Sequence, residues 1–133
     1  MSGHANSESD ALPRPASTDQ ILTALSAHRI AGLSESHVQS TISEALTSAG
    51  IDHTREYRLS RRDRIDFLIG TVGIEVKIKG SRADVIRQLG RYAESQQITE
   101  LILACSMRRL LYGVPNEILG VPVRKHLLQG GLS

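Results

Sequence analysis

Around residue 50 the spacing of the apolar residues changes from a helical period to alternation, and this change determines the class of fold. Before it, apolar residues recur three and four positions apart, in the stripe Val38, Ile42, Ala45, Leu46 and Ala49. After it, apolar residues occupy every second position, in Val72, Ile74, Val76 and Ile78. A period near 3.6 indicates a helix with one buried face, and a period of 2 indicates a strand. The chain is therefore expected to be an α/β protein.

The other elements follow from the same two periods and from the residues that end them. Helices are predicted over residues 18–28, from the N-cap candidate Ser34 to Gly50, and after Gly80-Ser81. Strands are predicted over residues 53–60, 64–69, 72–79, 98–107 and 121–128, the last one peripheral and preceded by a loop with Gly and Pro. The predicted order is α-α-β-β-β-α-β-β, a mixed sheet with helices on both faces.

Length and composition bound the domain organisation. The 133 residues suffice for one domain, 40% of them are hydrophobic, and residues 1–18 read as a flexible tail before a single domain over 19–133. The single cysteine, Cys105, excludes an internal disulfide or a multi-cysteine metal site. No stretch approaches the roughly 20 apolar residues that cross a bilayer, and the first residues lack a signal core. A soluble, cytoplasmic protein with no membrane partner is expected.

Positive charge is concentrated in the middle of the chain. Residues 1–50 carry two basic and five acidic residues, residues 51–92 carry ten and six, and residues 93–133 carry four and three. The middle segment could meet a polyanion, or it could simply present a solvated basic face. With one Phe, three Tyr and no Trp, a broad platform for stacking single-stranded bases is not expected.

Three charged residues are expected to lie together on one face of a β-hairpin. Asp66 belongs to its first strand, Glu75 and Lys77 belong to its second, and residues 70–73 form the turn. If Gly70 and Gly73, the first and last residues of this turn, pair with each other, Asp66 pairs with Lys77. Leu68 then pairs with Glu75. Opposed Cβ atoms are roughly 4.5–5.5 Å apart. The alternative is a sheet face that is simply solvated.

This juxtaposition has a chemical meaning. Two carboxylates on neighbouring strands offer the hard oxygen ligands that Mg²⁺ prefers, while leaving positions for water and a phosphate oxygen. A lysine beside them can orient the attacking water and offset developing negative charge.

The arrangement Asp…Glu-x-Lys resembles the PD-(D/E)xK nuclease superfamily, whose fold is called restriction-endonuclease-like. The matching segments are residues 64–69 (RIDFLI) and 73–77 (GIEVK), with Ile65 where the motif name has Pro. In the following helix, Gln88 and Tyr92 are four residues apart, similar to the Gln-x-x-x-Tyr signature of the RecB-like branch. The resemblance covers about residues 34–128.

The resemblance implies hydrolysis of phosphodiester bonds in DNA with Mg²⁺, or Mn²⁺ as an alternative ion. Asp66 and Glu75 would bind the metal together with the Val76 carbonyl, and Lys77 would position the water. Gln88 and Tyr92 would orient the active site or the nucleic-acid backbone.

Such folds usually supply a further acidic residue from the helix before the sheet. On a helical wheel Glu35 lies close to the apolar stripe, whereas Glu44 points nearly opposite. Glu35 is therefore the preferred further metal ligand, although a first-turn glutamate can also simply favour the helix dipole. Glu56 on the first strand is a third candidate.

Basic residues flank both strands of the hairpin, and we expect them either to contact phosphates or to form ordinary solvated loops: Arg61, Arg62, Arg64, Lys79 and Arg82. The expected partner is DNA, with assembly into a homodimer or a larger nucleic-acid-processing complex. Two other functions stay open: a catalytically inactive nuclease-fold module for DNA binding or assembly, and an unrelated small α/β interaction protein. Intact Asp66, Glu75 and Lys77 favour the enzyme.

Overall fold

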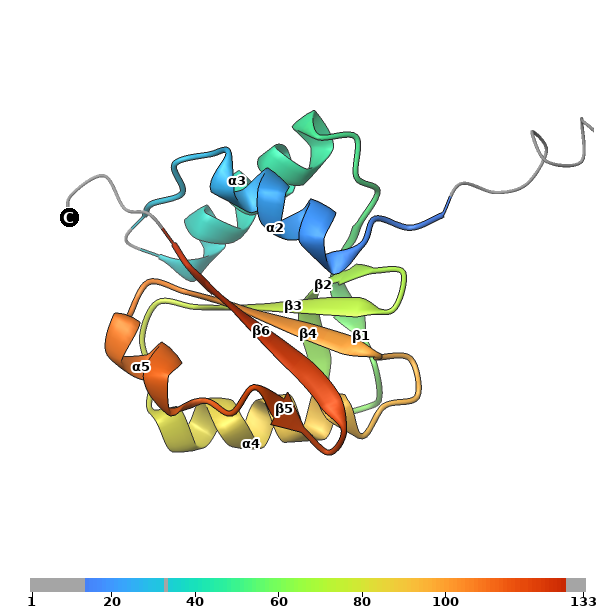
Figure 1. Cartoon of the computed structure of the whole chain (residues 1–133), viewed down its shortest axis with the longest axis vertical. Coiled ribbons are helices and arrows are strands. Elements are labelled where there is room, and N and C mark those ends of the chain that lie inside the picture. Colours follow the sequence, from blue (N-terminus) through green and yellow to red (C-terminus); the bar gives the residue numbers. More distant parts are fainter. Residues whose placement is uncertain (1–13, 33, 129–133) are drawn as a thin grey trace, which may run out of the picture.

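The computed structural model of the chain describes residues 14–32 and 34–128 (Figure 1). Within these ranges it is a mixed α/β structure, as predicted, with a six-stranded sheet in the order β1-β2-β3-β4-β6-β5. The strands are β1 (Thr54–Arg58), β2 (Arg64–Ile69), β3 (Val72–Lys77), β4 (Glu100–Cys105), β5 (Glu117–Ile118) and β6 (Val121–Leu127). Strands β1, β2 and β3 are antiparallel neighbours, β3, β4 and β6 are parallel, and β5 runs antiparallel to β6.

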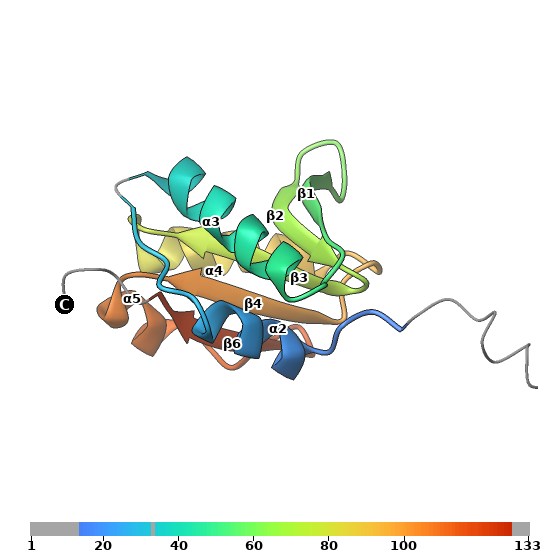
Figure 2. The same cartoon turned by 90° about the horizontal axis from the view of Figure 1, so that it is seen from above.

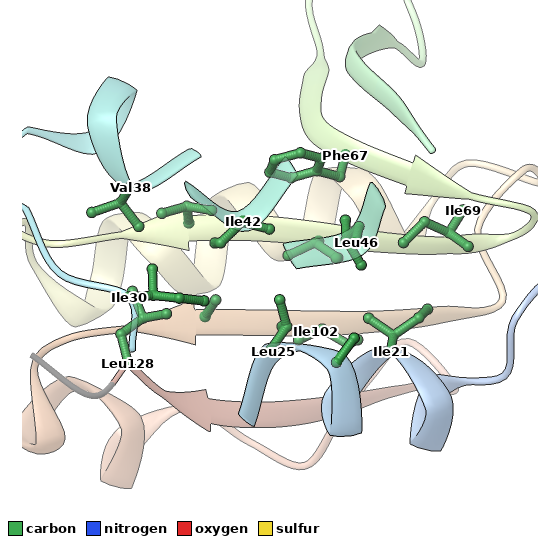
Figure 3. Close-up of a cluster of buried hydrophobic side chains, with 14 of the residues drawn as sticks. Ile21, Leu25, Ile30, Val38, Ile42, Leu46, Phe67, Ile69, Ile102 and Leu128 are labelled. Atoms are coloured by element: carbon green, nitrogen blue, oxygen red, sulfur yellow. The ribbon is translucent and has the colours of Figure 1, made fainter. Parts of the chain in front are cut away.

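Helices cover both faces of this sheet, so that a buried layer lies on each side. The helices α2 (Thr18–Ser26) and α3 (Glu35–Ser48) lie on one face, and α4 (Arg82–Ala93) and α5 (Arg108–Gly113) lie on the other (Figures 1 and 2). Figure 3 shows the first layer, where Ile21, Ile42 and Phe67 are fully buried. The second layer holds Leu89 and Tyr92 of α4. Both layers are mainly aliphatic, as the scarcity of aromatic residues requires.

Serine side chains begin the three longer helices. The hydroxyls of Ser17, Ser34 and Ser81 accept backbone N–H groups at the starts of α2, α3 and α4, which satisfies donors that a helix leaves unpaired. Of the predicted tail, residues 1–13 lie outside the described residues. From residue 14 the chain is described, Ala16 packs against the core, and Thr18 begins α2.

The segment predicted as a loop before the last strand is structured. It contains α5 and β5, so the observed order within the described residues is α-α-β-β-β-α-β-α-β-β. Both elements are too short to give a periodic signal, with six and two residues, and α5 begins without a side-chain cap at Met107. Strand β6 pairs with β4 from Val123 to Leu127, and with β5 at Val121 and Pro122.

The hairpin between β2 and β3 turns one residue earlier than predicted. Ile69 pairs with Val72, so the turn residues are Gly70 and Thr71. Gly70 has φ +61°, a conformation that a glycine adopts easily and a β-branched residue does not. The glycine therefore takes the first turn position, and Val72 is left to enter the buried layer.

Strands β1 and β2 change face at Glu56, which sequence periodicity did not predict. Arg55 pairs with Phe67, which packs under α2 and α3, whereas Tyr57 pairs with Ile65, which packs under α4. Residues two apart on a regular strand share a face. Glu56 has φ +53° and interrupts the alternation. Ile65 and Phe67, two residues apart on β2, therefore pack in different layers of the core.

Candidate active site

The ladder between β2 and β3 ends in a pair of carboxylates. The last residue pair of the ladder is Phe67 with Ile74, and beyond it the Val76 N–H donates to Asp66 Oδ2 at 2.8 Å. Two residues further, the Ile78 N–H donates to Glu35 Oε2 at 3.4 Å. Alternate residues of a strand direct their N–H groups to the same side. Asp66 and Glu35 therefore lie along one edge of β3, where a neighbouring strand would otherwise supply carbonyl groups.

The observed register of β2 and β3 differs from the predicted one. Leu68 pairs with Gly73, so the predicted pairing of Asp66 with Lys77, and of Leu68 with Glu75, is wrong. The turn moved by one residue, which shifts each partner by two. The three charged residues still lie near one another: the Lys77 ammonium is 3.4 Å from Glu75 Oε2, and the charge of Asp66 raises the pKa of Glu75.

Glu75 is the deepest of these groups. It is 3% exposed, and within the described residues it is the one charged residue classed as buried. Its Oε2 lies 3.4 Å from the Lys77 ammonium, and its Oε1 lies 3.1 Å from the Tyr92 hydroxyl. A buried carboxyl group needs such partners, because desolvation without them is costly.

Helix α4 supplies a second layer of support to Glu75. The Gln88 amide donates to the Tyr92 hydroxyl at 2.9 Å, and this hydroxyl also lies 3.0 Å from the Arg64 carbonyl oxygen. Residues four apart lie on the same side of a helix, which is why the two side chains meet. Gln88, Tyr92 and Glu75 therefore form one hydrogen-bonded chain from the helix to the strand.

The electrostatics of the site disfavour ionisation of both carboxyl groups relative to their usual pKa values. Burial raises the pKa of Glu75 to about 8, and the charge of Asp66 adds to this, against the opposing Lys77. Burial also raises the pKa of Asp66 to about 6, with contributions from Glu56 and Glu35, while the Val76 N–H lowers it. Two acids that resist simultaneous ionisation at short range are suited to a site where a cation supplies the missing charge.

The three candidate glutamates occupy different environments. Glu35 is half-buried at the β3 edge and raises the pKa of Asp66. Glu44 is exposed on α3. Glu56 forms an ion pair with Arg64 at 3.1 Å, with both side chains about half exposed. Of the three, Glu35 has the direct hydrogen bond to the strand that carries Glu75.

The basic residues fall into two groups at opposite ends of α4. Arg61 and Arg62 are exposed in the loop between β1 and β2. An ion pair between Asp63 and Arg91, at 2.8 Å, connects this loop to the C-terminal part of α4. Lys79 and Arg82 are exposed at its N-terminal end. A 12-residue helix is about 18 Å long. Arg64 lies beside Glu56 and forms an ion pair with it.

The ion pair between Asp63 and Arg91 was not predicted from the sequence, because no sequence pattern marks partners that are 28 residues apart.

The donor set suits a magnesium-like ion more than a transition metal. Within residues 14–32 and 34–128, no three His, Cys, Asp or Glu side chains converge into a ready metal cage. Mg²⁺ does not require one, because it usually keeps several waters and takes one or two carboxylates. Asp66 and Glu75 supply these, and the Val76 carbonyl is directed to the same side of β3 as the N–H that Asp66 accepts.

A cavity of about 890 Å³ lies away from this chemistry, between Arg14–Ala16, α2, the end of α3 and Gly70. None of the predicted site residues lines it. The described helices include none with the length and apolar character needed to span a membrane.

Comparisons with family models, curated proteins and solved structures found no match to this chain.

Proposed function

We propose that this protein is a metal-dependent DNA nuclease of the PD-(D/E)xK type, with the Gln-x-x-x-Tyr helix of the RecB-like branch and a restriction-endonuclease-like fold. The observation that carries the proposal is the environment of Glu75: a buried carboxyl whose pKa is raised by burial and by the charge of Asp66, with the Lys77 ammonium at 3.4 Å. A buried acidic pair beside a lysine is costly for stability, and it is explained most simply by catalysis.

In the proposed mechanism Asp66, Glu75 and the Val76 carbonyl hold Mg²⁺, or Mn²⁺. When bound, the ion acts as a Lewis acid on the scissile phosphate and lowers the pKa of a bound water. The Lys77 ammonium positions the attacking water and offsets the charge that develops on the phosphate oxygens. Gln88 and Tyr92 fix the orientation of Glu75 through the chain of hydrogen bonds from α4.

Residues around this centre have proposed supporting roles. Glu35 is the proposed further metal ligand, through a water or directly, because its carboxylate shares the β3 edge with Asp66. The two basic groups at the ends of α4, with Arg61 and Lys79 as members, are proposed to contact phosphates on either side of the scissile bond. The partner is DNA, and a place in a larger nucleic-acid-processing complex and a cytoplasmic location remain part of the proposal.

Cleavage of defined DNA substrates tests the proposal. Purified protein is incubated with supercoiled, linear, single-stranded and branched DNA, with Mg²⁺, Mn²⁺ or EDTA. We expect cleavage with either metal and none with EDTA. Lys77→Ala should abolish cleavage and leave metal binding and the fold intact, because a partly exposed lysine contributes little to stability. Asp66→Ala should remove both cleavage and metal binding.

The matched control is Lys125→Ala, a half-buried lysine on β6. It should cleave like the unaltered protein. Full nuclease activity of Lys77→Ala would refute the assignment. Salt-sensitive binding of DNA without cleavage by the unaltered protein, in any of the metals, would favour the catalytically inactive module.

A further inference from the structure

One aromatic side chain is exposed on the face that carries the candidate active site. Of the four aromatic residues, Phe67 and Tyr92 are buried, and Tyr57 is half-buried with its hydroxyl bonded to Gln97. Tyr112 of α5 is 81% exposed. An aromatic ring this exposed makes no contribution to the core, although a ring surface in water is available for stacking.

Two arginines lie beside this ring on the same helix. Arg108 and Arg109 precede Tyr112 by four and three residues, so both are neighbours of Tyr112 along α5. Both arginines are exposed, whereas Leu110 is buried and holds the helix against the sheet. Planar guanidinium groups flanking an aromatic ring complement the alternation of phosphates and bases along a nucleic-acid strand.

Helix α5 lies at the end of the sheet where the candidate site opens. Cys105, the last residue of β4, pairs with Lys77, and the next N–H, that of Ser106, donates to the Lys77 carbonyl at 3.2 Å. The helix starts two residues later and lies next to the N-terminal end of α4 (Figure 1). A strand bound along α5 would therefore lead toward Lys77.

A small basic cavity joins α5 to α4 at this point. Its volume is about 370 Å³, within the range of about 300–1,000 Å³ that is usual for ligand pockets. Arg82 and Arg109 line it, no acidic side chain does, and the side chain of Arg82 extends over Gly113. The cavity thus offers a place for a phosphate about one helical turn from the exposed ring, since Arg109 lines it and precedes Tyr112 by three residues.

We infer that α5 binds unpaired DNA: the ring of Tyr112 stacks on one base, and Arg109 and Arg82 hold the adjacent phosphate in the cavity between α5 and α4. This inference rests on the proposed function and specifies its substrate as DNA with a single-stranded segment. One ring stacks on one base, which is consistent with a composition too poor in aromatics for a broad platform. A base in a duplex is already stacked on its neighbours and cannot use the ring.

Binding in EDTA tests the inference without any cleavage. Fluorescence anisotropy is measured with a short labelled single strand and with the blunt duplex of the same sequence. Tyr112→Ala should weaken binding of the single strand about tenfold, which is within the range for loss of one stacked base, and leave duplex binding unchanged. Tyr112→Phe should bind like the unaltered protein, because stacking needs the ring and not the hydroxyl. Arg109→Ala should reduce the salt dependence of single-strand binding by about one phosphate contact.

Leu119→Ala is the matched control, since Leu119 is another exposed large apolar residue, 69% exposed, outside α5. It should leave both affinities unchanged. Equal affinity of the Tyr112→Ala variant and the unaltered protein for the single strand would overturn the inference, as would an equal loss for single strand and duplex. If the unaltered protein cleaves no DNA with metal, but Tyr112→Ala still weakens single-strand binding, the nuclease proposal fails and this inference stands.

Discussion

Glu75 makes the stability of the metal-free protein depend on pH. Its folded pKa of about 8 lies above the ordinary value of 4.5, and that of Asp66, about 6, lies above 3.8. When the pKa of a group is higher in the folded state than in the unfolded state, its contribution to stability is complete at pH values below the unfolded-state pKa. This contribution is lost as the pH rises through the folded-state pKa. The unfolding free energy should therefore fall between roughly pH 4 and pH 8, by on the order of 5 kcal/mol from Glu75 alone.

Urea unfolding in EDTA at several pH values measures this loss. Glu75→Gln should abolish most of the pH dependence, because a neutral amide retains the hydrogen-bonding shape without the charge. Glu44→Gln, at an exposed position on α3, is the control and should retain it. A stability of the unaltered protein that is flat over this range would contradict the burial argument.

If Glu75 is catalytic, substitutions of Gln88 and of Tyr92 should change cleavage and stability to different extents. Gln88→Ala removes the donor to the Tyr92 hydroxyl and should lower cleavage more than stability, because this side chain is only partly buried. Tyr92→Ala should lower both, and truncation of a buried aromatic typically costs about 3 kcal/mol or more. Thermal unfolding alongside cleavage rates compares the two. Normal cleavage by a Gln88→Ala protein that only melts earlier would mean that the signature is coincidental.

At the scale of elements, the turn between β5 and β6 is strained. Ile118 pairs with Val121, and the two residues between them both have positive φ: +51° for Leu119 and +81° for Gly120. This is the type I′ pattern, in which Asn-Gly is preferred because Asn tolerates the left-handed region. Leu119→Asn should therefore stabilise the protein by about 1 kcal/mol. Thermal unfolding measures the gain, and Ile118→Val at the neighbouring strand position serves as a control without it.

Elements with strong local signals were predictable from the sequence. Serines that cap helices and the alternation of apolar residues predicted α3 and β2 nearly to the residue, and predicted where α4 starts. The short α5 was missed because six residues carry little periodicity and Met107 gives no capping signal. The predicted register of the hairpin was wrong because the predicted turn lay one residue too late. Both Gly70 and Gly73 are turn candidates in the sequence, and the sequence does not distinguish them. In the structure Gly73 lies instead under the Ile65 side chain, in space that a Cβ would fill.

The residues of the candidate site could be predicted from the sequence, but the hydrogen bonds between them could not. The parity of the strands predicts one shared face for Asp66, Glu75 and Lys77 whichever of the two turns forms. The hydrogen bonds from Val76 to Asp66 and from Ile78 to Glu35 depend on where the ladder stops, and this is a tertiary property. The left-handed Glu56 has no sequence signal either, since glutamate rarely adopts that conformation.

At the scale of the whole molecule, the apolar segment near the C-terminus covers the core. An apolar segment such as residues 110–128 either covers the core or forms an interface between copies, because large exposed apolar patches are rare on monomers. In the structure Leu110, Val114, Val121, Val123 and Leu128 are buried within the chain. This segment therefore gives no support to the expected homodimer. We expect a mass near 14.5 kDa by light scattering at micromolar concentration, with cleavage linear in protein concentration. Twice that mass would indicate another interface.

Both outer strands of the described sheet are poor templates for a further strand. On one side the left-handed Glu56 breaks the line of β1. On the other side β5 has two residues, and β6 continues beyond it with the charged Arg124 and Lys125. Bulged, short and charged edges discourage edge-to-edge association of sheets. The folded chain should therefore resist forming intermolecular β-structure and stay dispersed at the high concentrations that crystallisation and NMR spectroscopy require.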